Sequence, residues 1–499
     1  MKWLLGIAVL VVVASSWWWY CRRRRRKERK AGVPKGRLGW PIIGETLDYI
    51  LHGYSSRPED FMMKRRALYG KVFKTNILGS PTIVSTDVEV NKAILQNDGK
   101  TFVPFYPKTV TELLGKSSIL QMNGSLQRKV HGLIGGFFKS PALKAQITRD
   151  MDGYVRRAMR RWTDGQTVRI QDETKTITFR VLVKALMSVE GKEEVEELRK
   201  DFKEFTAGLM CLPLNLPFTT LHKSLQAKKR MVGMVNKVIK EKMGKGSGEV
   251  VDAIDALLKE VTSHSGGTGG GGGGGGEEGE ERLSPEFLSE NIVEMMIPGE
   301  DSVPILMSLA IKYLSDCPSA LQLLREENME MKREKSERGE ALSWNDYMSL
   351  PFTQNVISET LRMGNIINGV MRKALNDVEI KGHLIPKGWR VLASFRSVHL
   401  DEESYDSPYR FDPWRWQRRE SSGCIHFTPF GGGHRLCPGL DLSRLETSIF
   451  LHHFTTSFSW VAEEDEIINF PTVRMKRGLP VIVKPILDLC SVDQSSVDL

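Results

Sequence analysis

The stretch FGGGHRLCPG, residues 430–439, decides how the rest of this chain is interpreted. Its three consecutive glycines, 431–433, allow the backbone to turn tightly and to approach a flat ligand closely. Cys437 follows in a loop directly before LDLSRLETSIFLHHF, whose spacing of apolar residues predicts a helix. A thiolate at that place would be stabilised by the helix N-terminus and by backbone donors. Arg435, two residues earlier, could hold a carboxylate.

Five positions of this stretch resemble the haem-binding loop that defines cytochromes P450, namely Phe430, Gly433, Arg435, Cys437 and Gly439. The resemblance implies that these residues bind haem b, with Cys437 as the thiolate ligand of the iron and Arg435 on a propionate. The alternative is a free, buried cysteine in a glycine-rich turn, since cysteine is among the most buried residue types.

A second motif is the pair Glu359 and Arg362, whose spacing of three residues puts both charges on one helix face. The spacing alone is not specific, because it recurs elsewhere in the chain. The order of the motifs along the chain is specific, because this pair is followed by FDPWRW, residues 411–416, and then by the cysteine loop, as in the resembled family. The resemblance implies that Arg415 completes a buried structural cluster that locks the loop presenting the thiolate.

A third motif is MMIPGEDSVP, residues 295–304, inside an otherwise helical run. It is similar to the family's central helix, and the similarity implies that Gly299, Asp301 and Ser302 are catalytic, with Asp301 and Ser302 relaying protons to bound oxygen. Pro298 and Ser302 stand where the family usually has Ala and Thr. Pro298 and Pro304 each remove a backbone donor and predict a kink. The alternative is a helix N-terminus capped by Asp301 and Ser302.

Further haem contacts are expected from three basic residues. Arg128 and His131 lie in GSLQRKVHG, residues 124–132, where the family has a helix whose basic residues reach the propionates. The usual aromatic residue or His at position 127 is Gln here. Arg372 lies in the strand-like VMRKAL and is the other predicted propionate partner. A surface location is the alternative for each.

The fold class expected is mainly α with a small β-sheet region, arranged as a cytochrome P450 fold. Apolar residues recur at helical spacing over 140–162, 175–208, 222–243, 249–262, 284–335 and 440–458. Residues 71–86 and 377–398 read as strands and turns. The glycine-rich stretch 263–282 is expected to be a disordered loop inside one catalytic domain, residues 46–490, with a tail at 491–499; a domain boundary there is the alternative.

The N-terminus predicts a membrane anchor. Residues 3–20 carry no charge for 18 positions and end in an aromatic cluster, and 22–30 read RRRRRKERK. We expect a single transmembrane helix over 1–21, a basic stop and a Pro/Gly hinge over 22–45, and a cytosolic body on the endoplasmic reticulum membrane. A signal peptide and a nuclear localisation patch are the alternatives. Because most of the formal charge of +10 lies in this run, we expect no nucleic-acid partner.

The resemblance implies a monooxygenase that inserts one atom of O2 into a lipophilic substrate. No nicotinamide or flavin motif is present, so electrons from NADPH must come through a cytochrome P450 reductase in the same membrane lipid. The stretches TLRMGNIINGVMRKALNDVEIKGHLIPKGW, SPYRFDPWRW and FGGGHRLCPGLDLSRLE look like plant enzymes of brassinosteroid biosynthesis, which implies steroid hydroxylation at carbon 23 or oxidation at carbon 3. Gibberellin precursors, abscisic acid and triterpenes are alternative substrates. A non-enzymatic haem-thiolate sensor and a peroxide-rearranging enzyme are alternative functions.

Overall fold

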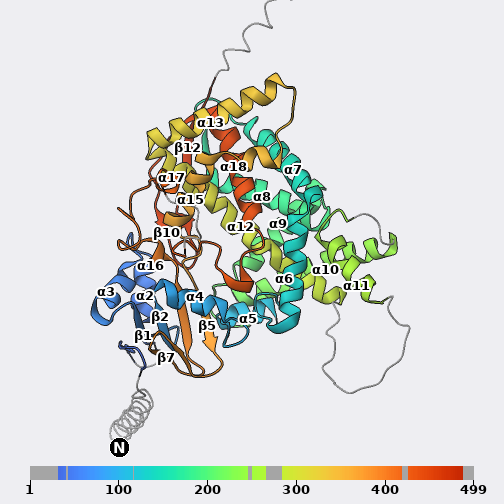
Figure 1. Cartoon of the computed structure of the whole chain (residues 1–499). Coiled ribbons are helices and arrows are strands. Elements are labelled where there is room, and N and C mark those ends of the chain that lie inside the picture. The colour runs from blue at the N-terminus through green and yellow to red at the C-terminus, as the bar shows by residue number, and fades with distance from the viewer. Residues whose placement is uncertain are drawn as a thin grey trace, which may run out of the picture.

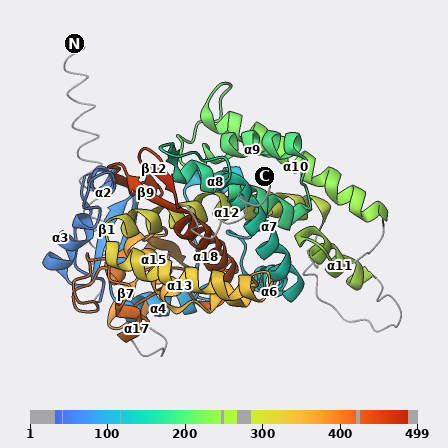
Figure 2. The same cartoon turned by 90° about the horizontal axis from the view of Figure 1, so that it is seen from above.

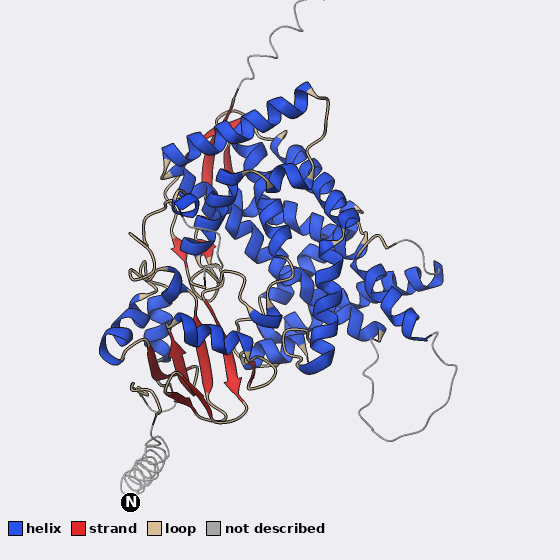
Figure 3. Cartoon of the chain, in the orientation of Figure 1, coloured by secondary structure: helices blue, strands red, loops and turns tan. Residues whose placement is uncertain are grey.

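The computed structural model describes residues 32–40, 43–115, 117–245, 250–265, 284–418 and 425–486. The predicted transmembrane helix, the basic run, most of the glycine-rich loop and the tail at 491–499 lie outside these residues. Within the described ranges, no helix has the length and apolar character needed to cross a membrane. Helices make up most of the body, and the strands gather at one end with a smaller group at the other (Figure 3). The expected mainly α fold with small sheets is therefore confirmed.

The helices have bounds that follow the apolar spacing of the sequence. They are α2 (Thr46–Gly53), α3 (Asp60–Tyr69), α4 (Val88–Gln96), α5 (Lys108–Leu114), α6 (Gly124–Lys139), α7 (Pro141–Met159), α8 (Ile170–Met187), α9 (Lys192–Thr206), α10 (Thr220–Lys245), α11 (Ala253–Ser265), α12 (Pro285–Ser315), α13 (Pro318–Glu337), α14 (Trp344–Met348), α15 (Pro351–Gly364), α16 (Arg396–His399), α17 (Arg415–Arg418) and α18 (Leu440–Ser457). Two predicted runs each divide into two helices. The first divides at Ser188, whose backbone is left-handed with φ +57°, and the second at Pro318, which cannot donate a helical hydrogen bond.

Helix α12 is the centre of the helical body. It begins at Pro285, with the Ser284 side chain capping it by accepting a hydrogen bond from the Phe287 amide. Its 31 residues give a length of about 46 Å. It packs against α8, α10, α15 and α18, and both views show it crossing the middle of the molecule (Figures 1 and 2). Apolar residues on nearly all sides explain this central position.

The main sheet has five strands in the order β1-β2-β8-β5-β3. Its strands are β1 (Val72–Ile77), β2 (Ser80–Ser85), β3 (Phe102–Pro104), β5 (Gly369–Ala374) and β8 (Arg390–Ser394). Only the β2–β8 pair among these is parallel. The predicted strand regions 71–86 and 377–398 supply β1, β2 and β8, together with the hairpin of β6 (Val378–Ile380) and β7 (His383–Ile385). The sheet therefore joins the N-terminal part of the chain to the segment that follows α15.

Two further sheets complete the fold. β4 (Thr167–Arg169), β12 (Pro480–Pro485) and β9 (Phe458–Ala462) form an antiparallel sheet, and β10 (Ile467–Ile468) pairs with β11 (Arg474–Met475). The first of these sheets packs at the end of the buried helix α18. Through β9, which continues directly from α18, it fixes the far end of the helix that starts at the cysteine loop.

Helix α18 buries one carboxyl group, which makes stability depend on pH. Burial raises the pKa of Glu446 to about 8. Since its folded-state pKa lies above the ordinary value near 4.5, the stability that the neutral form provides is complete below pH 4.5 and is lost as pH rises through 8. We expect Glu446→Gln to raise the melting temperature at pH 9 and to leave it almost unchanged at pH 4. Equal effects at both pH values in thermal unfolding would refute this assignment.

Candidate haem-thiolate site

The cysteine loop has the geometry that its sequence predicts. The Cys437 amide donates to the Phe430 carbonyl at 3.1 Å, which closes the loop around the short 3₁₀ helix η1 (Gly433–Arg435). Helix α18 begins three residues after Cys437, with Gly439 as its N-cap. Burial raises the pKa of the Cys437 thiol, and a hydrogen bond from the backbone at Gly439 opposes this rise. The thiol is thus held at the positive end of a helix, where a bound cation would favour the thiolate.

Gly433 has a role that the sequence does not reveal. Its φ is +66°, and a Cβ built on it would lie 2.3 Å from the Leu95 carbonyl oxygen. A side chain at 433 would therefore strain its own backbone and push the loop away from α4. The glycine lets the cysteine loop pack directly on α4, in addition to the tight turning that the sequence predicts.

Arg372 and Arg435 are brought together by a residue that was not predicted from the sequence, Asp98. The Arg372 Nε donates to Asp98 Oδ2 at 3.0 Å, and Arg435 Nε lies 2.8 Å from the same oxygen. The contact between Arg435 and Asp98 is an ion pair only, because the direction of the Arg435 Nε–H bond does not allow a hydrogen bond to the carboxylate. Asp98 is 1% exposed in its side chain, and its Oδ1 is buried without a partner. One carboxylate therefore orients both predicted propionate-binding arginines.

Asp98→Asn should weaken haem retention. The Asn side chain keeps the shape but loses the charge that holds two buried guanidinium groups, and hydrogen bonds to charged groups are worth about 1.5–3 kcal/mol. We expect haem transfer to an excess of apomyoglobin to become about 10-fold faster. Asp316→Asn, at an exposed carboxylate 3.7 Å from Lys312, is the matched control and should not change the rate. An unchanged rate in Asp98→Asn would show that Asp98 does not position these arginines.

Helix α6 reaches the same region through His131, one of the two residues predicted on it, and also carries the buried Gln127. His131 Nε2 lies 2.9 Å from the Leu436 carbonyl oxygen, so it contacts the cysteine loop itself. Gln127 is buried, and its Oε1 has no partner. Arg128 is exposed and close enough to His434 to help lower the pKa of that ring, although burial is the larger cause. The inward-facing residue of this turn is therefore Gln127, and the propionate contact of Arg128 stays a prediction.

Glu359, Arg362 and Arg415 form the buried cluster predicted from their order. Arg362 donates to both Glu359 oxygens at 2.9 and 2.8 Å, and Arg415 Nε donates to Oε1 at 3.0 Å. Trp416 Nε1 and the Asp412 amide donate to the same carboxylate, each at 3.0 Å. The side chains of Glu359 and Arg362 are fully buried. Five donors converge on one carboxylate, which is how a buried charge is satisfied.

His399, which was not predicted from the sequence, links this cluster to the cysteine loop. Its carbonyl accepts from Arg362 Nη1 at 2.8 Å, while its ring Nε2 accepts from the Thr428 amide at 3.0 Å. Its Nδ1 lies 2.8 Å from Asn365 Oδ1, which assigns the proton to Nδ1. Burial and the neighbouring arginines lower the pKa of His399 to about 3. A neutral histidine therefore connects the buried cluster to the start of the loop that contains Cys437.

The third motif lies in the middle of α12, so the alternative of a capped helix N-terminus is wrong. Asp301 is 16 residues beyond the first residue of the helix, and the helix continues through Pro298 and Pro304. Asp301 Oδ1 forms an ion pair with Lys175 Nζ of α8 at 2.8 Å, and its side chain is 41% exposed. Burial lowers and Asp301 raises the pKa of Lys175, with a net rise. Asp301 is therefore both paired and in contact with solvent.

Gly299 and Ser302 lie in different surroundings on α12. A Cβ on Gly299 would lie 2.5 Å from Leu182 Cδ2, so this glycine lets α12 and α8 approach closely. Ser302 is half-buried, and Pro298 is exposed although most of the helix around it is buried. Residues 295, 298 and 302 share one helix face by their spacing. This face is the more accessible side of α12 at this point, half-buried at Met295 and Ser302 and exposed at Pro298, whereas Gly299 acts in helix packing.

Asp301→Asn should lower product formation about 100-fold or more, because a positioned general acid contributes about 10²–10⁴ to a rate. Haem content should stay unchanged, because the ion pair of Asp301 is with Lys175 of α8 and not with a predicted haem-binding residue. Glu300→Gln is the matched control at the adjacent acid, which is buried and close to the α9 residues Arg199 and Lys203. The measurement is product per haem. Equal losses in both variants would exclude a specific relay through Asp301.

The residues present fit a haem group. Cys437 lies three residues before α18, Arg372 and Arg435 converge on the Asp98 carboxylate, and Asp98 Oδ1, Gln127 Oε1 and Arg435 Nε are buried without hydrogen-bond partners. An anionic group at this place would satisfy such atoms. A cysteine before a helix N-terminus and two arginines that converge beside it are typical of a haem-thiolate protein.

The chain belongs to the cytochrome P450 family, because the family model described as Cytochrome P450 matches residues 34–485. It is similar in structure to a retinoic acid-bound cyanobacterial CYP120A1, with a TM-score of 0.78 over 92% of this chain and all of that one, at 24% identity. That likeness concerns the fold. The chain is a cytochrome P450 monooxygenase whose cofactor is haem with a cysteine thiolate ligand, and it uses O2 and electrons supplied by a redox partner.

Two plant relatives cover nearly the whole chain. One is the 3-epi-6-deoxocathasterone 23-monooxygenase CYP90D1 of Arabidopsis thaliana, 57% identical over 91% of this chain and 90% of that protein. The second is the 3-epi-6-deoxocathasterone 23-monooxygenase CYP90C1 of the same plant, 57% identical over 93% of this chain and 87% of that protein. A third, the 3beta,22alpha-dihydroxysteroid 3-dehydrogenase of Arabidopsis thaliana, is 42% identical over 91% of this chain and 93% of that protein.

Proposed function

We propose that this protein hydroxylates carbon 23 of a brassinosteroid intermediate related to 3-epi-6-deoxocathasterone. The observation that carries the proposal is the 57% identity to two monooxygenases of that name over about nine-tenths of each chain. Oxidation at carbon 3 is the second candidate, and it is favoured less because the relative named for it is 42% identical. Both relatives with the 23-monooxygenase name agree on the carbon, so we assign the side chain as the position attacked.

We assign Cys437 as the thiolate ligand and Arg372 and Arg435 as the residues that hold the anionic edge of the haem. When bound, the haem supplies activation of O2 at its iron. Asp301 takes up protons from solvent on its exposed side and passes them to the Ser302 hydroxyl, after leaving its ion pair with Lys175. Two features of Asp301 support this order of steps. Its carboxylate lies 2.8 Å from Lys175 Nζ, and its side chain is still 41% exposed to solvent. The buried cluster around Glu359 keeps the cysteine loop in register through His399.

We also propose that the protein is anchored in the endoplasmic reticulum membrane by residues 1–21, with its body in the cytosol and an NADPH–cytochrome P450 reductase as electron donor. The uncharged run before the arginines supports this topology. Exposed apolar side chains in the α9–α10 connection support it too, with Leu212 74% and Phe218 89% exposed. Leu47 and Leu51 of α2, whose side chains are 61% and 69% exposed, support the same topology. Large exposed apolar groups are typical of membrane contact sites.

The experiment is a product assay with full-length protein in membranes, plant reductase and NADPH. Three substrates are offered separately: 3-epi-6-deoxocathasterone, a gibberellin precursor and abscisic acid. The proposal predicts a product from the steroid that is heavier by one oxygen atom, with fragmentation placing it on the side chain. A product lighter by two hydrogens would establish oxidation at carbon 3 instead. Turnover of another hormone without the steroid would overturn the steroid assignment.

A further inference from the structure

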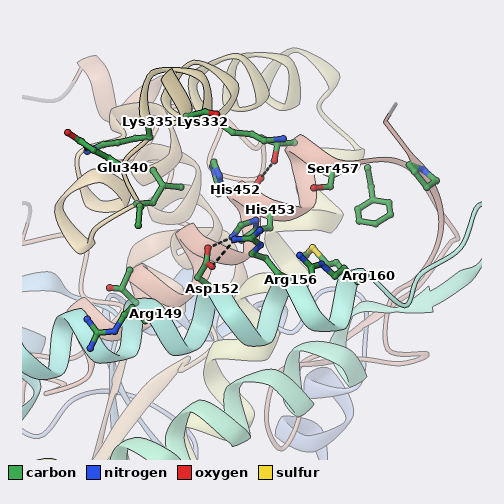
Figure 4. A pocket seen from close by; sticks show the side chains of 18 of the residues that line it. Arg149, Asp152, Arg156, Arg160, Lys332, Lys335, Glu340, His452, His453 and Ser457 are labelled. Atoms are coloured by element: carbon green, nitrogen blue, oxygen red, sulfur yellow. Dashed lines mark hydrogen bonds and ion pairs between the residues drawn. The ribbon is translucent and has the colours of Figure 1, made fainter. Parts of the chain in front are cut away.

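An open cavity of about 790 Å³ lies between α7, the end of α13 and the end of α18, away from the haem-thiolate site (Figure 4). None of its lining residues belongs to the site described above. Arg149, Asp152 and Arg156 come from α7, Lys332 and Lys335 from α13, and His452 and His453 from α18. Three helices that meet over a wide opening thus form a second concave surface on the protein.

The rim of this cavity carries excess positive charge. Its basic side chains are Arg149, Arg156, Arg160, Lys332 and Lys335, against the two carboxylates Asp152 and Glu340. The carboxylates are already engaged, since Asp152 lies 2.7 Å from His453 Nε2 and Glu340 lies 2.9 Å from Lys335 Nζ. Asp346 also lies 3.1 Å from Lys335 Nζ, so five basic groups face three carboxylates and a formal surplus of two positive charges is left at the opening. Such a rim attracts an acidic segment.

The floor of the cavity is apolar. Trp162 and Phe458 pack together there with ring centroids 5.5 Å apart, and Met159 and Leu342 also line it. Trp162 and Phe458 are themselves buried, so their rings form a firm base rather than a mobile surface. A ligand that alternates acidic and apolar side chains would match both the rim and the floor.

The chain itself leaves the described structure at this cavity. Strand β12 ends at Pro485, and the Ile486 amide donates to the Ser457 carbonyl at 2.8 Å; Pro485 and Ser457 both line the cavity. Residues 487–499, LDLCSVDQSSVDL, lie outside the described residues. They contain three aspartates, five Leu and Val residues that flank these aspartates, and no Lys, Arg or His. Thirteen residues reach about 40 Å when extended, enough to cross the opening.

We propose that residues 487–499 bind in this cavity, with their aspartates on the basic rim and their leucines and valines on the aromatic floor. The segment is tethered at the edge of the cavity, so its effective concentration there is in the millimolar range and weak ion pairs suffice. The occupant is this chain's own C-terminal segment, and its binding is a salt-sensitive contact because the rim charges are exposed.

The test is zero-length crosslinking of the full-length protein. A carbodiimide joins a carboxylate to a lysine amine only when the two are in direct contact, and peptide mass spectrometry identifies the pair. We expect crosslinks from Asp488, Asp493 or Asp498 to Lys332 or Lys335. The Lys335–Glu340 pair, at 2.9 Å, serves as the internal positive control. Absence of the first crosslinks in a sample that contains the second would overturn the proposal.

Charge-reversal variants provide the specificity control. Arg149→Glu with Arg160→Glu should lower the yield of crosslinks from the segment about fivefold or more, since each exposed ion pair is worth about 0.2–1 kcal/mol. Arg157→Glu is the matched control on the same helix, because Arg157 lies over the Tyr154 ring and does not line the cavity. Equal yields in the double variant and Arg157→Glu would contradict binding in the cavity. Crosslinks between isotopically light and heavy molecules would assign the segment to a second copy and also overturn it.

Discussion

Cys437→Ser abolishes product formation if Cys437 is the haem ligand. Serine has nearly the same size, but its hydroxyl does not ionise near neutral pH and cannot replace a thiolate on iron. We expect no detectable turnover and loss of the Soret band that a thiolate-ligated, reduced carbon monoxide complex shows. The measurements are haem content, that spectrum and product per haem, all on the same preparation.

The matched control is Cys211→Ser, at a half-buried cysteine between α9 and α10. Its Sγ contacts only backbone carbonyls in the hydrogen bonds that the structure gives, at 3.3 Å to Gly208 and Leu212. This variant should keep both the spectrum and turnover. A Cys437→Ser protein with the wild-type spectrum would refute the assignment of the ligand.

Glu359→Gln should be the most destabilising single change outside the haem ligand. It removes the charge on which Arg362 and Arg415 converge and leaves two guanidinium groups buried, 0% and 8% exposed, without their counter-charge. Removing one partner of a buried ion pair lowers the free energy of unfolding by about 3–5 kcal/mol. Through His399 the damage reaches the cysteine loop, so we expect haem content to fall together with the free energy of unfolding.

A control with the same spacing is available at Glu330 and Arg333, which also lie three residues apart on a helix and form an ion pair at 2.5 Å. Both side chains are more than half exposed, so Glu330→Gln should change the free energy of unfolding by less than about 1 kcal/mol. Denaturant unfolding of both variants measures the difference. Similar losses in the two would contradict the role of burial in the Glu359 cluster.

The motifs around the site could be predicted because each is short and its order along the chain is informative. Cys437 with its glycines, and Glu359 with Arg362 and then Arg415, fall together in the structure as the sequence suggests. The acid-hydroxyl pair at 301–302 was placed correctly inside a long helix. In these cases local spacing and order carry most of the information.

The residues that connect the motifs could not be predicted, because their partners are far away in the sequence. Asp98 meets Arg372 from 274 residues away, and His399 meets Thr428 through a backbone donor that has no sequence signature. The role of Gly299 could not be predicted either, since only the position of Leu182 in α8 shows that it serves helix packing. Tertiary contacts of this kind depend on the whole fold.

Hydroxylation at carbon 23 is measured directly by turnover of 3-epi-6-deoxocathasterone under isotopically heavy O2, with reductase and NADPH present. We expect a product that contains one heavy oxygen atom, located at carbon 23 of the side chain. An unlabelled product, or a ketone at carbon 3 without a labelled side chain, would contradict it.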